Sequence, residues 1–374
     1  MKTKGAIVWQ PGEPWTIEEL ELGDPIAGEI QVRLAASGMC HSDEHLRKGD
    51  APAVYPYLGG HEGAGIVTKV GPGVTNFQEG DHVVLVFIPA CGKCVPCSKG
   101  MQNLCDYGAL IMSGQSISDG TNRVTCKGQG VMPMALLGTF SPYVTVHEAS
   151  AIKVRDDMPL DKAALLSCGI PTGYGSAAIV GDVQPGDAVV VVGIGGIGMN
   201  AVQGAKLAGA KYVVAIDPVQ SKQDRARQFG ATHTFSSMAE ALEPVRDLTW
   251  GTMADKVILT VGEMYGNYVQ EALDLTGKGG RTVVTGLGPF WNRDAVIDLF
   301  MFSMMQKELK GTVFGGSSPR ATIPRLIDMY LEGQLMIDEL ITNEYKLEDI
   351  NQAYADMYNG TNIRGLIRYT EADY

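Results

Sequence analysis

Two β-branched runs separated by a glycine-rich turn and a helical segment constrain the fold of this chain more than any other feature. Residues 188–193 read AVVVVG and residues 211–217 read KYVVAID. Continuous apolar runs of this kind are typical of strands buried on both faces of a parallel sheet. Helical segments separate most of the shorter strand patterns that follow, at residues 232–235, 255–262, 279–288 and 308–316. Six strands alternating with helices predict an α/β fold with a six-stranded, doubly wound parallel sheet.

The turn after the first of these strands carries a nucleotide-binding pattern. Residues 193–198 read GIGGIG, which fits G-x-G-x-x-G in the required context of a strand followed by a helix. The glycines of this turn are Gly193, Gly195, Gly196 and Gly198. Asp217 ends the next strand, where a carboxylate binds ribose hydroxyls and repels a 2′-phosphate. We therefore expect NAD rather than NADP, with Lys222 also within reach of the ribose; a plain tight turn is the alternative.

The first 150 residues follow a different pattern. Short apolar or alternating runs such as AIVW, EIQVRLAA and DHVVLVF are bounded by Gly, Pro and Asp, and few segments are long enough for an amphipathic helix. This pattern predicts an antiparallel, partly barrel-like domain. The last stretch, from about Ser317, contains two helical segments and closes with a strand pattern, IRGLIRY.

Four cysteines lie close together in CGKCVPCSKGMQNLC. They are Cys91, Cys94, Cys97 and Cys105. Short C-x2-C steps let one loop supply several corners of a zinc tetrahedron, and four thiolates leave no open position, so a zinc ion here would be structural. Free thiols and an iron–sulfur cluster are the alternatives.

Three further residues offer a second ligand set. Cys40, His61 and Cys168 are two cysteines and one histidine, the ligands of one class of catalytic zinc that keeps a fourth position open. Spacing alone supports this grouping weakly, because other histidines are available and a buried Cys168 is equally typical of a plain core position.

Together these motifs strongly resemble the zinc-dependent medium-chain alcohol dehydrogenases, from end to end of the chain. GMCHSDEH, GHEGAG, the four-cysteine loop, LLSCGIPTGYG, GIGGIG and IRGLIRY occur in the family's order. The resemblance implies a GroES-like catalytic domain formed by residues 1–169 and 313–374, and a Rossmann-type NAD-binding domain over residues 170–312. The chain resembles the liver-like and glutathione-dependent branch. More narrowly, it is similar to actinobacterial, mycofactocin-associated nicotinoprotein alcohol dehydrogenases, which hold NAD(H) without release and use a nitroso electron acceptor in assays.

The resemblance also assigns the metal-site residues. Cys40, His61 and Cys168 match the ligands of a catalytic zinc, and the four-cysteine loop matches a structural zinc, giving two zinc ions per chain. Asp43 matches the carboxylate that hydrogen-bonds the zinc-bound histidine, which fixes the imidazole tautomer. Glu62 matches an acid behind the zinc, with either a structural role or a transient ligand role.

Proton-transfer and cofactor roles follow in the same way. Ser42 and His45 match the relay that passes the alcohol proton to solvent. Thr172 matches a position near the nicotinamide, and Arg364 matches an arginine that contacts the pyrophosphate, although a surface salt bridge is its alternative. His41 stands where many relatives have a second pyrophosphate-binding arginine, which weakens that contact.

The resemblance implies an apolar substrate pocket. Phe87 and Leu110 match residues that line the alcohol pocket in relatives, although both could be plain core. Ala109 stands where the glutathione-dependent relatives have an arginine, which disfavours formaldehyde–glutathione oxidation.

The expected activity is oxidation of a primary or apolar alcohol to its aldehyde with NAD, recycled in place by an external electron acceptor. An ordinary alcohol dehydrogenase that exchanges NAD and an S-(hydroxymethyl)glutathione dehydrogenase are the alternatives. A non-catalytic NAD-binding protein is the alternative from another class.

Net charge and the distribution of apolar residues limit which partners and which cell compartment we expect for this chain. The net charge is −12 over 374 residues, which argues against nucleic acid or an anionic membrane as the main partner. No signal sequence and no apolar run of about 18 residues is evident, so we expect a cytoplasmic chain. A methionine-rich segment, LFMFSMMQ (299–306), indicates core or a subunit interface, and we expect a homo-oligomer. Cys126 has no expected role beyond that of a small buried residue.

Overall fold

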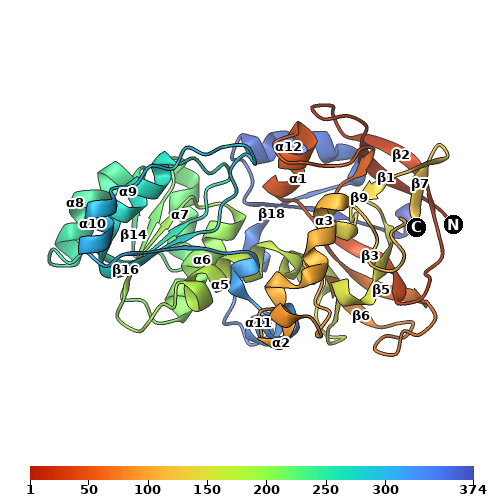
Figure 1. Cartoon of the computed structure of the whole chain (residues 1–374), viewed down its shortest axis with the longest axis horizontal. Helices are drawn as coiled ribbons and strands as arrows, with labels where there is room; N and C mark the ends of the chain where they lie inside the picture. The colour runs from red at the N-terminus through yellow and green to blue at the C-terminus, as the bar shows by residue number, and fades with distance from the viewer. The chain divides into compact units, whose positions relative to one another are not determined.

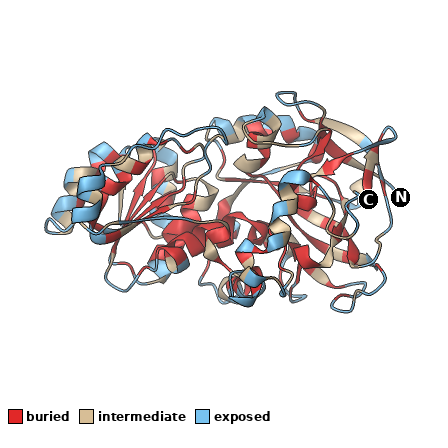
Figure 2. Cartoon of the chain, in the orientation of Figure 1, coloured by how far each residue is buried: buried red, intermediate tan, exposed pale blue.

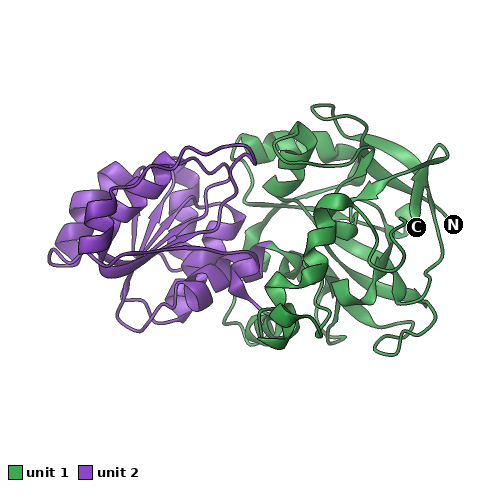
Figure 3. Cartoon of the chain, viewed as in Figure 1, with its two compact units in different colours: residues 1–168, 318–374 green, residues 169–317 purple.

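The computed structural model describes residues 1–374 and divides into two compact units (Figure 3). Unit 1 comprises Met1–Cys168 and Ser318–Tyr374, and unit 2 comprises Gly169–Ser317. The boundaries expected from the sequence, after residues 169 and 312, lie one and five residues from these. The chain therefore leaves unit 1 for a single continuous insertion and then returns to complete it.

Unit 2 is built on a six-stranded parallel sheet in the order β14-β13-β12-β15-β16-β17 (Figure 1). Its strands are β12 (Ala188–Val192), β13 (Tyr212–Ile216), β14 (His233–Phe235), β15 (Ala254–Leu259), β16 (Thr276–Val284) and β17 (Glu308–Gly311). The chain runs outward from β12 in one direction and then from β15 in the other, so the order reverses beside β12. This is the predicted doubly wound arrangement, in which ligands bind at the carboxyl ends of the strands near the reversal.

The central strands of this sheet are buried because helices cover them (Figure 2). The helices of unit 2 are α5 (Gly169–Gly175), α6 (Gly196–Leu207), α7 (Gln220–Gln228), α8 (Met238–Leu248), α9 (Asn267–Leu275) and α10 (Leu299–Met304). All five residues of β12 are buried, as its β-branched sequence predicts. The expected strand 308–316 is too long, because the backbone turns at Phe314 and Gly315, both with positive φ.

Unit 1 contains two further sheets. The first has the strands β1 (Lys2–Val8), β2 (Thr16–Leu22), β4 (Tyr57–Leu58), β7 (Val124–Cys126), β8 (Gln129–Gly130) and β9 (Met132–Pro133). The second has β3 (Glu29–Gly38), β5 (Glu62–Val70), β6 (His82–Leu85), β10 (Tyr143–His147), β11 (Ala151–Lys153), β18 (Ile341–Tyr345) and β19 (Arg364–Arg368). The pairing is antiparallel as expected, except that β4 with β9 and β18 with β19 are parallel.

The C-terminal strand β19 pairs antiparallel with β3, which returns the chain to the first domain. The helices of unit 1 are α1 (His41–Lys48), α2 (Val95–Ser98), α3 (Leu110–Ser113), α4 (Leu160–Ala163), α11 (Pro319–Leu331) and α12 (Ile350–Tyr358). Side chains from both sheets and from α12 share one core that includes Trp15, Phe140 and Tyr354.

The methionine-rich segment does not lie in the core of the chain. It forms α10, in which Leu299, Phe300 and Met304 are 67%, 71% and 66% exposed. No single helix is long and apolar enough to cross a membrane; one bent pair, Leu160–Ser167 with Gly169–Val180, meets the length and composition criteria together.

Candidate active site

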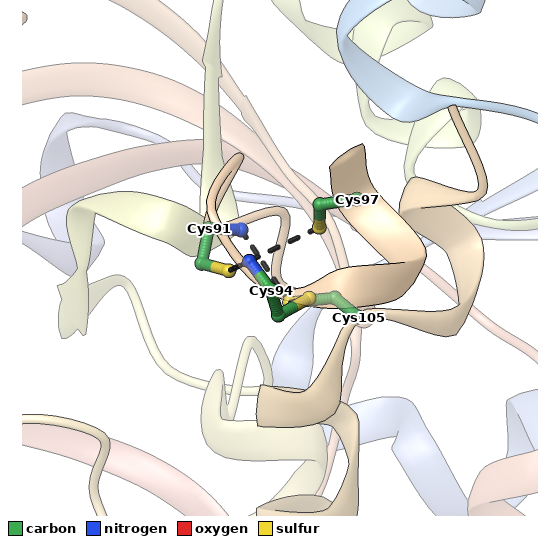
Figure 4. Close-up of side chains that lie close together, drawn as sticks. All are labelled: Cys91, Cys94, Cys97 and Cys105. Carbon is green, nitrogen blue, oxygen red and sulfur yellow. Dashed lines mark hydrogen bonds between the residues drawn. The ribbon is translucent and has the colours of Figure 1, made fainter. Parts of the chain in front are cut away.

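Four cysteine sulfurs meet in a lobe of unit 1 around α2 (Figure 4). The Sγ atoms of Cys91 and Cys97 are 3.9 Å apart, as are those of Cys94 and Cys105. Thiolates at the corners of a zinc tetrahedron, each about 2.3 Å from the metal, lie roughly 3.8 Å from one another. The observed spacing therefore fits one tetrahedral ion and is far too long for a disulfide bond.

Backbone amides stabilise negative charge on these sulfurs. The N–H of Cys94 donates to Cys91 Sγ at 3.4 Å, and the N–H of Cys91 donates to Cys105 Sγ at 3.4 Å. The N–H of Asp106 donates to Cys94 Sγ at 3.5 Å. A thiolate is the form that binds zinc, so the loop is built for a closed, structural site.

A second buried cluster brings together Cys40, His61, Glu62 and Cys168. One potential ligand atom from each lies within 4.8 Å of all the others. Cys40 is the N-cap of α1, His61 directly precedes β5, and Glu62 begins that strand. All four residues are at most 6% exposed. The three ligands that spacing alone grouped weakly are thus adjacent in space, and Glu62 joins them.

The ionisable groups of this cluster shift one another's pKa values. The hydrogen bond with the Cys168 thiol lowers the pKa of Cys40 well below its usual value, and the same contact raises the pKa of Cys168. Burial alone would lower the pKa of His61, but the Asp43 carboxylate raises it well above its usual value. Two thiols and one imidazole whose ligand atoms lie within 4.8 Å of one another form a donor set that fits Zn²⁺.

Neighbouring residues orient these ligands. An Asp43 oxygen lies 3.3 Å from His61 Nδ1 and also accepts the N–H of Gly60 at 2.9 Å. Ser167, which the sequence did not single out, exchanges two 3.0 Å hydrogen bonds with the backbone of Gly63. It thereby ties β5 to the segment that carries Cys168. Its position directly before a cysteine was the only sequence signal for it.

Glu62 and Arg364 form a buried ion pair beside the cluster. Arg364 Nη2 donates to Glu62 Oε2, whereas Glu62 Oε1 and Arg364 Nε have no hydrogen-bond partner in the chain. Burial raises the pKa of Glu62, and the Arg364 guanidinium opposes that rise. Arg364 is 5% exposed, so the surface salt bridge is excluded. The free carboxylate oxygen fits a ligand role next to a metal.

The helix α1 carries the predicted relay residues. The Cys40 thiol donates to Ser42 Oγ at 3.6 Å, and His45 Nδ1 lies 3.2 Å from Asp50 Oδ2. Ser42 and His45 are three positions apart and so share one face of the helix. His41, at the first turn, packs edge-on against the ring of Tyr358.

The two expected pocket residues differ in their surroundings. The Phe87 ring packs edge-on against the His61 ring at a centroid distance of 5.7 Å, which places an apolar wall at the metal cluster. Leu110 lies half-buried at the start of α3, while its neighbour Ile111 packs, as Phe87 does, against the core of unit 1.

In unit 2, the glycine turn occupies the carboxyl end of β12. Gly193 has φ +86°, and a Cβ on Gly198 would lie 2.0 Å from the Gly193 carbonyl oxygen, so the chain itself requires both glycines. A Cβ on Gly195, by contrast, would meet nothing within 4 Å. Gly195 is the N-cap of α6, and open space at a helix N-terminus fits a pyrophosphate. Gly196 begins the helix itself.

The ribose and nicotinamide residues also fit a dinucleotide. Asp217 accepts the N–H groups of Ile194 and Val219 at 2.8 and 2.9 Å, which fixes its carboxylate beside the glycine turn. Lys222 Nζ lies 3.9 Å from that carboxylate. Thr172 is 6% exposed on α5, and its Oγ1 has no hydrogen-bond partner in the chain. A buried, unpaired hydroxyl fits a ligand contact.

Comparison with known proteins decides the family. The family described as "Alcohol dehydrogenase GroES-like domain" matches residues 26–156 of this chain, and the family described as "Zinc-binding dehydrogenase" matches residues 196–332. Alcohol dehydrogenase B of Mycobacterium tuberculosis is 52% identical over 374 residues, covering all of both chains. The chain belongs to the zinc-dependent alcohol dehydrogenases. It is an oxidoreductase of this family, with zinc and NAD as its cofactors.

Two further comparisons refine the relationship. The NDMA-dependent alcohol dehydrogenase of Amycolatopsis methanolica is 46% identical over 370 residues, covering 99% of this chain and 100% of the relative. The crystal structure of an alcohol dehydrogenase zinc-binding domain protein from Burkholderia ambifaria has a TM-score of 0.93 at 32% identity, covering 99% of this chain and 100% of that one. The relatives from Mycobacterium and Amycolatopsis confirm the resemblance to the actinobacterial branch.

Proposed function

We propose that this dehydrogenase oxidises a primary or apolar alcohol to its aldehyde at the Cys40, His61 and Cys168 cluster, and that it keeps NAD(H) bound between turnovers. The observation that carries the site is the burial of these three ligands within 4.8 Å of one another beside Ser42. When bound, zinc polarises the alcohol oxygen and NAD⁺ accepts hydride.

Residues of the chain itself are placed to transfer the hydroxyl proton of the alcohol. Ser42, beside the Cys40 sulfur, is placed to take the hydroxyl proton of the alcohol. His45, on the same face of α1, is placed to carry that proton toward solvent, and Asp50 orients its ring. Asp43 holds His61 in the orientation that a metal ligand needs.

Phe87 supports an apolar substrate, because its ring lies against His61 and offers an apolar surface beside the metal cluster. The benzyl alcohol dehydrogenase of Acinetobacter calcoaceticus has a TM-score of 0.91 and 29% identity to this chain, which supports an apolar substrate. The alanine at position 109 removes the cation expected of a glutathione-dependent enzyme.

Retention of the cofactor implies an external electron acceptor. The identity of 46% to an enzyme named for NDMA dependence supports this mode of turnover. Bound NADH must be reoxidised in place, so the proposal predicts activity with NDMA, a nitroso acceptor, when no NAD is added.

We also propose a homo-oligomer. The exposed apolar residues Leu299, Phe300 and Met304 of α10 lie in the same unit as β17, the end strand of the parallel sheet. Exposed apolar patches of this kind commonly mark protein interfaces. Sedimentation of the purified chain tests this: a monomer at micromolar concentration contradicts it.

One preparation tests the cofactor proposal. Protein that has never been exposed to added NAD is denatured, and the supernatant is assayed for nicotinamide, in parallel with alcohol turnover driven by NDMA or by added NAD. We expect one nicotinamide per chain and NDMA-driven turnover. No bound nicotinamide together with turnover on added NAD would instead indicate an ordinary, NAD-exchanging alcohol dehydrogenase.

A further inference from the structure

The helix α1 is short, and its side chains determine how it is held. An eight-residue helix is marginal in isolation, so its orientation depends on tertiary contacts. Two adjacent acidic residues, Asp43 and Glu44, are 0% and 1% exposed. Asp43 faces the metal cluster through His61. Glu44 belongs to no part of the site described above.

Glu44 is the centre of a buried hydrogen-bond network. Its Oε1 accepts from Arg47 Nε at 2.7 Å and from the Trp15 indole at 3.0 Å. Its Oε2 accepts from Arg47 Nη2 at 2.8 Å and from the Tyr358 hydroxyl at 3.3 Å. The carboxylate is therefore held by donors from α1, from α12 and from the segment before β2.

The donors are themselves fixed. Asn351 exchanges hydrogen bonds of 3.1 and 2.9 Å with the backbone of Trp15, whose ring stacks on Tyr354. The Tyr354 hydroxyl donates to the carbonyl oxygen of Cys40 at 3.4 Å. The network thus contacts α1 both at Glu44 and at the N-cap residue that belongs to the metal cluster.

The position of Glu44 on the helix sets the direction of the relay residues. At about 100° per residue, Ser42 and His45 lie roughly 60° apart, and Glu44 lies about 100° from His45 and 160° from Ser42. The carboxylate accepts from Trp15 and Tyr358, both outside α1, and these two contacts therefore fix the rotation of α1 about its axis. Burying a charge is costly, and a well-packed apolar side chain would usually stabilise as well, so stability alone gives no reason for a charged group here.

We propose that Glu44 is a positioning residue: it sets the rotation of α1 and so holds Ser42 and His45 in line for proton transfer. This inference rests on the proposed function. The hydrogen-bond partners of the Glu44 carboxylate include no metal ligand, so Glu44 acts only through the helix.

The test uses Glu44→Gln in the full-length holoenzyme, with Glu29→Gln as the matched control. Glu29 is another buried carboxylate held by an arginine, Arg123, but it lies at the start of β3. Alcohol turnover is measured at constant pH and ionic strength against rising concentrations of a tertiary amine buffer. An external base replaces a misaligned His45, so buffer dependence separates loss of relay from loss of structure.

We expect Glu44→Gln to keep two zinc ions, to change KM less than twofold, and to lower kcat at least fivefold at low buffer, with recovery at high buffer. Glu29→Gln should show no buffer dependence, whatever its Tm. A kcat for Glu44→Gln that is unchanged, or lowered without recovery, would overturn the inference. Inactive wild-type protein would instead contradict the proposed function.

If Glu44→Gln does not fold, Trp15→Phe removes one donor to the carboxylate and keeps the stacked ring. We expect a smaller loss of kcat, of the same buffer-dependent kind. A Trp15→Phe enzyme whose kcat falls without any buffer response would overturn the inference equally.

Discussion

Replacing Gly195 with alanine separates what the glycine turn does for the fold from what it does for the cofactor. Gly195 has ordinary negative φ, −91°, and its Cβ would meet nothing within 4 Å. Alanine restricts the unfolded chain more than glycine does, which raises the free energy of unfolding by about 0.4–1 kcal/mol. Alanine is also a poorer N-cap than glycine, which lowers the free energy of unfolding by a comparable amount. The free energy of unfolding of the apoprotein should therefore change by less than about 1 kcal/mol.

Cofactor binding should respond very differently. The methyl group enters the open space at the N-terminus of α6 where a pyrophosphate would approach the backbone. We expect NAD affinity to fall at least about tenfold, which corresponds to roughly 1.4 kcal/mol. Gly198→Ala is the matched comparison: its Cβ would lie 2.0 Å from the Gly193 carbonyl oxygen, so this variant should lose stability as well, by about 1–3 kcal/mol.

Two assays decide the outcome. Urea unfolding of the apoproteins gives the stability of each variant, and NAD titration followed by fluorescence gives the affinity. Gly195→Ala with wild-type affinity for NAD would refute the reasoning that this space is reserved for the cofactor. A large loss of stability in Gly195→Ala would refute the claim that the chain itself leaves the space free.

Three further predictions concern other parts of the molecule. Cys94→Ser should lower zinc from two ions to one per chain and reduce Tm, and metal analysis that still finds two ions would contradict a site closed by four thiolates. Asp217→Asn removes the charge that repels a 2′-phosphate but keeps an acceptor oxygen, so the ratio of NADP to NAD affinity should rise at least about tenfold, or 1.4 kcal/mol; an unchanged ratio speaks against the ribose role. Trp250 is 92% exposed with φ +57°, so Trp250→Gly should raise the free energy of unfolding by about 1 kcal/mol without altering turnover, and a measured decrease would contradict this.

Local patterns predicted the parts of the molecule that neighbouring residues determine. The parallel sheet of unit 2 follows from runs such as 188–192, whose burial on both faces leaves a continuous β-branched sequence. The four-cysteine lobe is equally local, because its ligands lie within 15 residues of sequence, from Cys91 to Cys105. In both cases residues that are close in sequence are also close in space, so the sequence alone predicts their arrangement.

Tertiary contacts determined what the sequence did not reveal. The helix α1 consists of eight mostly polar residues, HSDEHLRK, and no apolar periodicity predicts it. The strands β4 and β9 have two residues each and exist only through tertiary pairing, β4 with β1 and β9, and β9 with β4. Arg364 turns inward to Glu62, 302 residues away, a pairing that only the fold brings about.

The segment 299–306 shows a different limit of prediction from sequence. Its apolar residues at helical spacing are equally typical of a core helix and of an interface, and periodicity does not distinguish the two. The structure excludes the core of the chain, because α10 exposes Leu299 and Phe300.

Zinc content tests the central claim most directly: the chain binds two ions at two independent sites, and only the Cys40, His61 and Cys168 site serves catalysis. Metal analysis of purified wild-type protein and of Cys40→Ser should give two ions and one ion per chain. The variant should keep its fold and its four-cysteine zinc while losing alcohol turnover. Full turnover by a Cys40→Ser protein that contains one zinc ion would contradict the account.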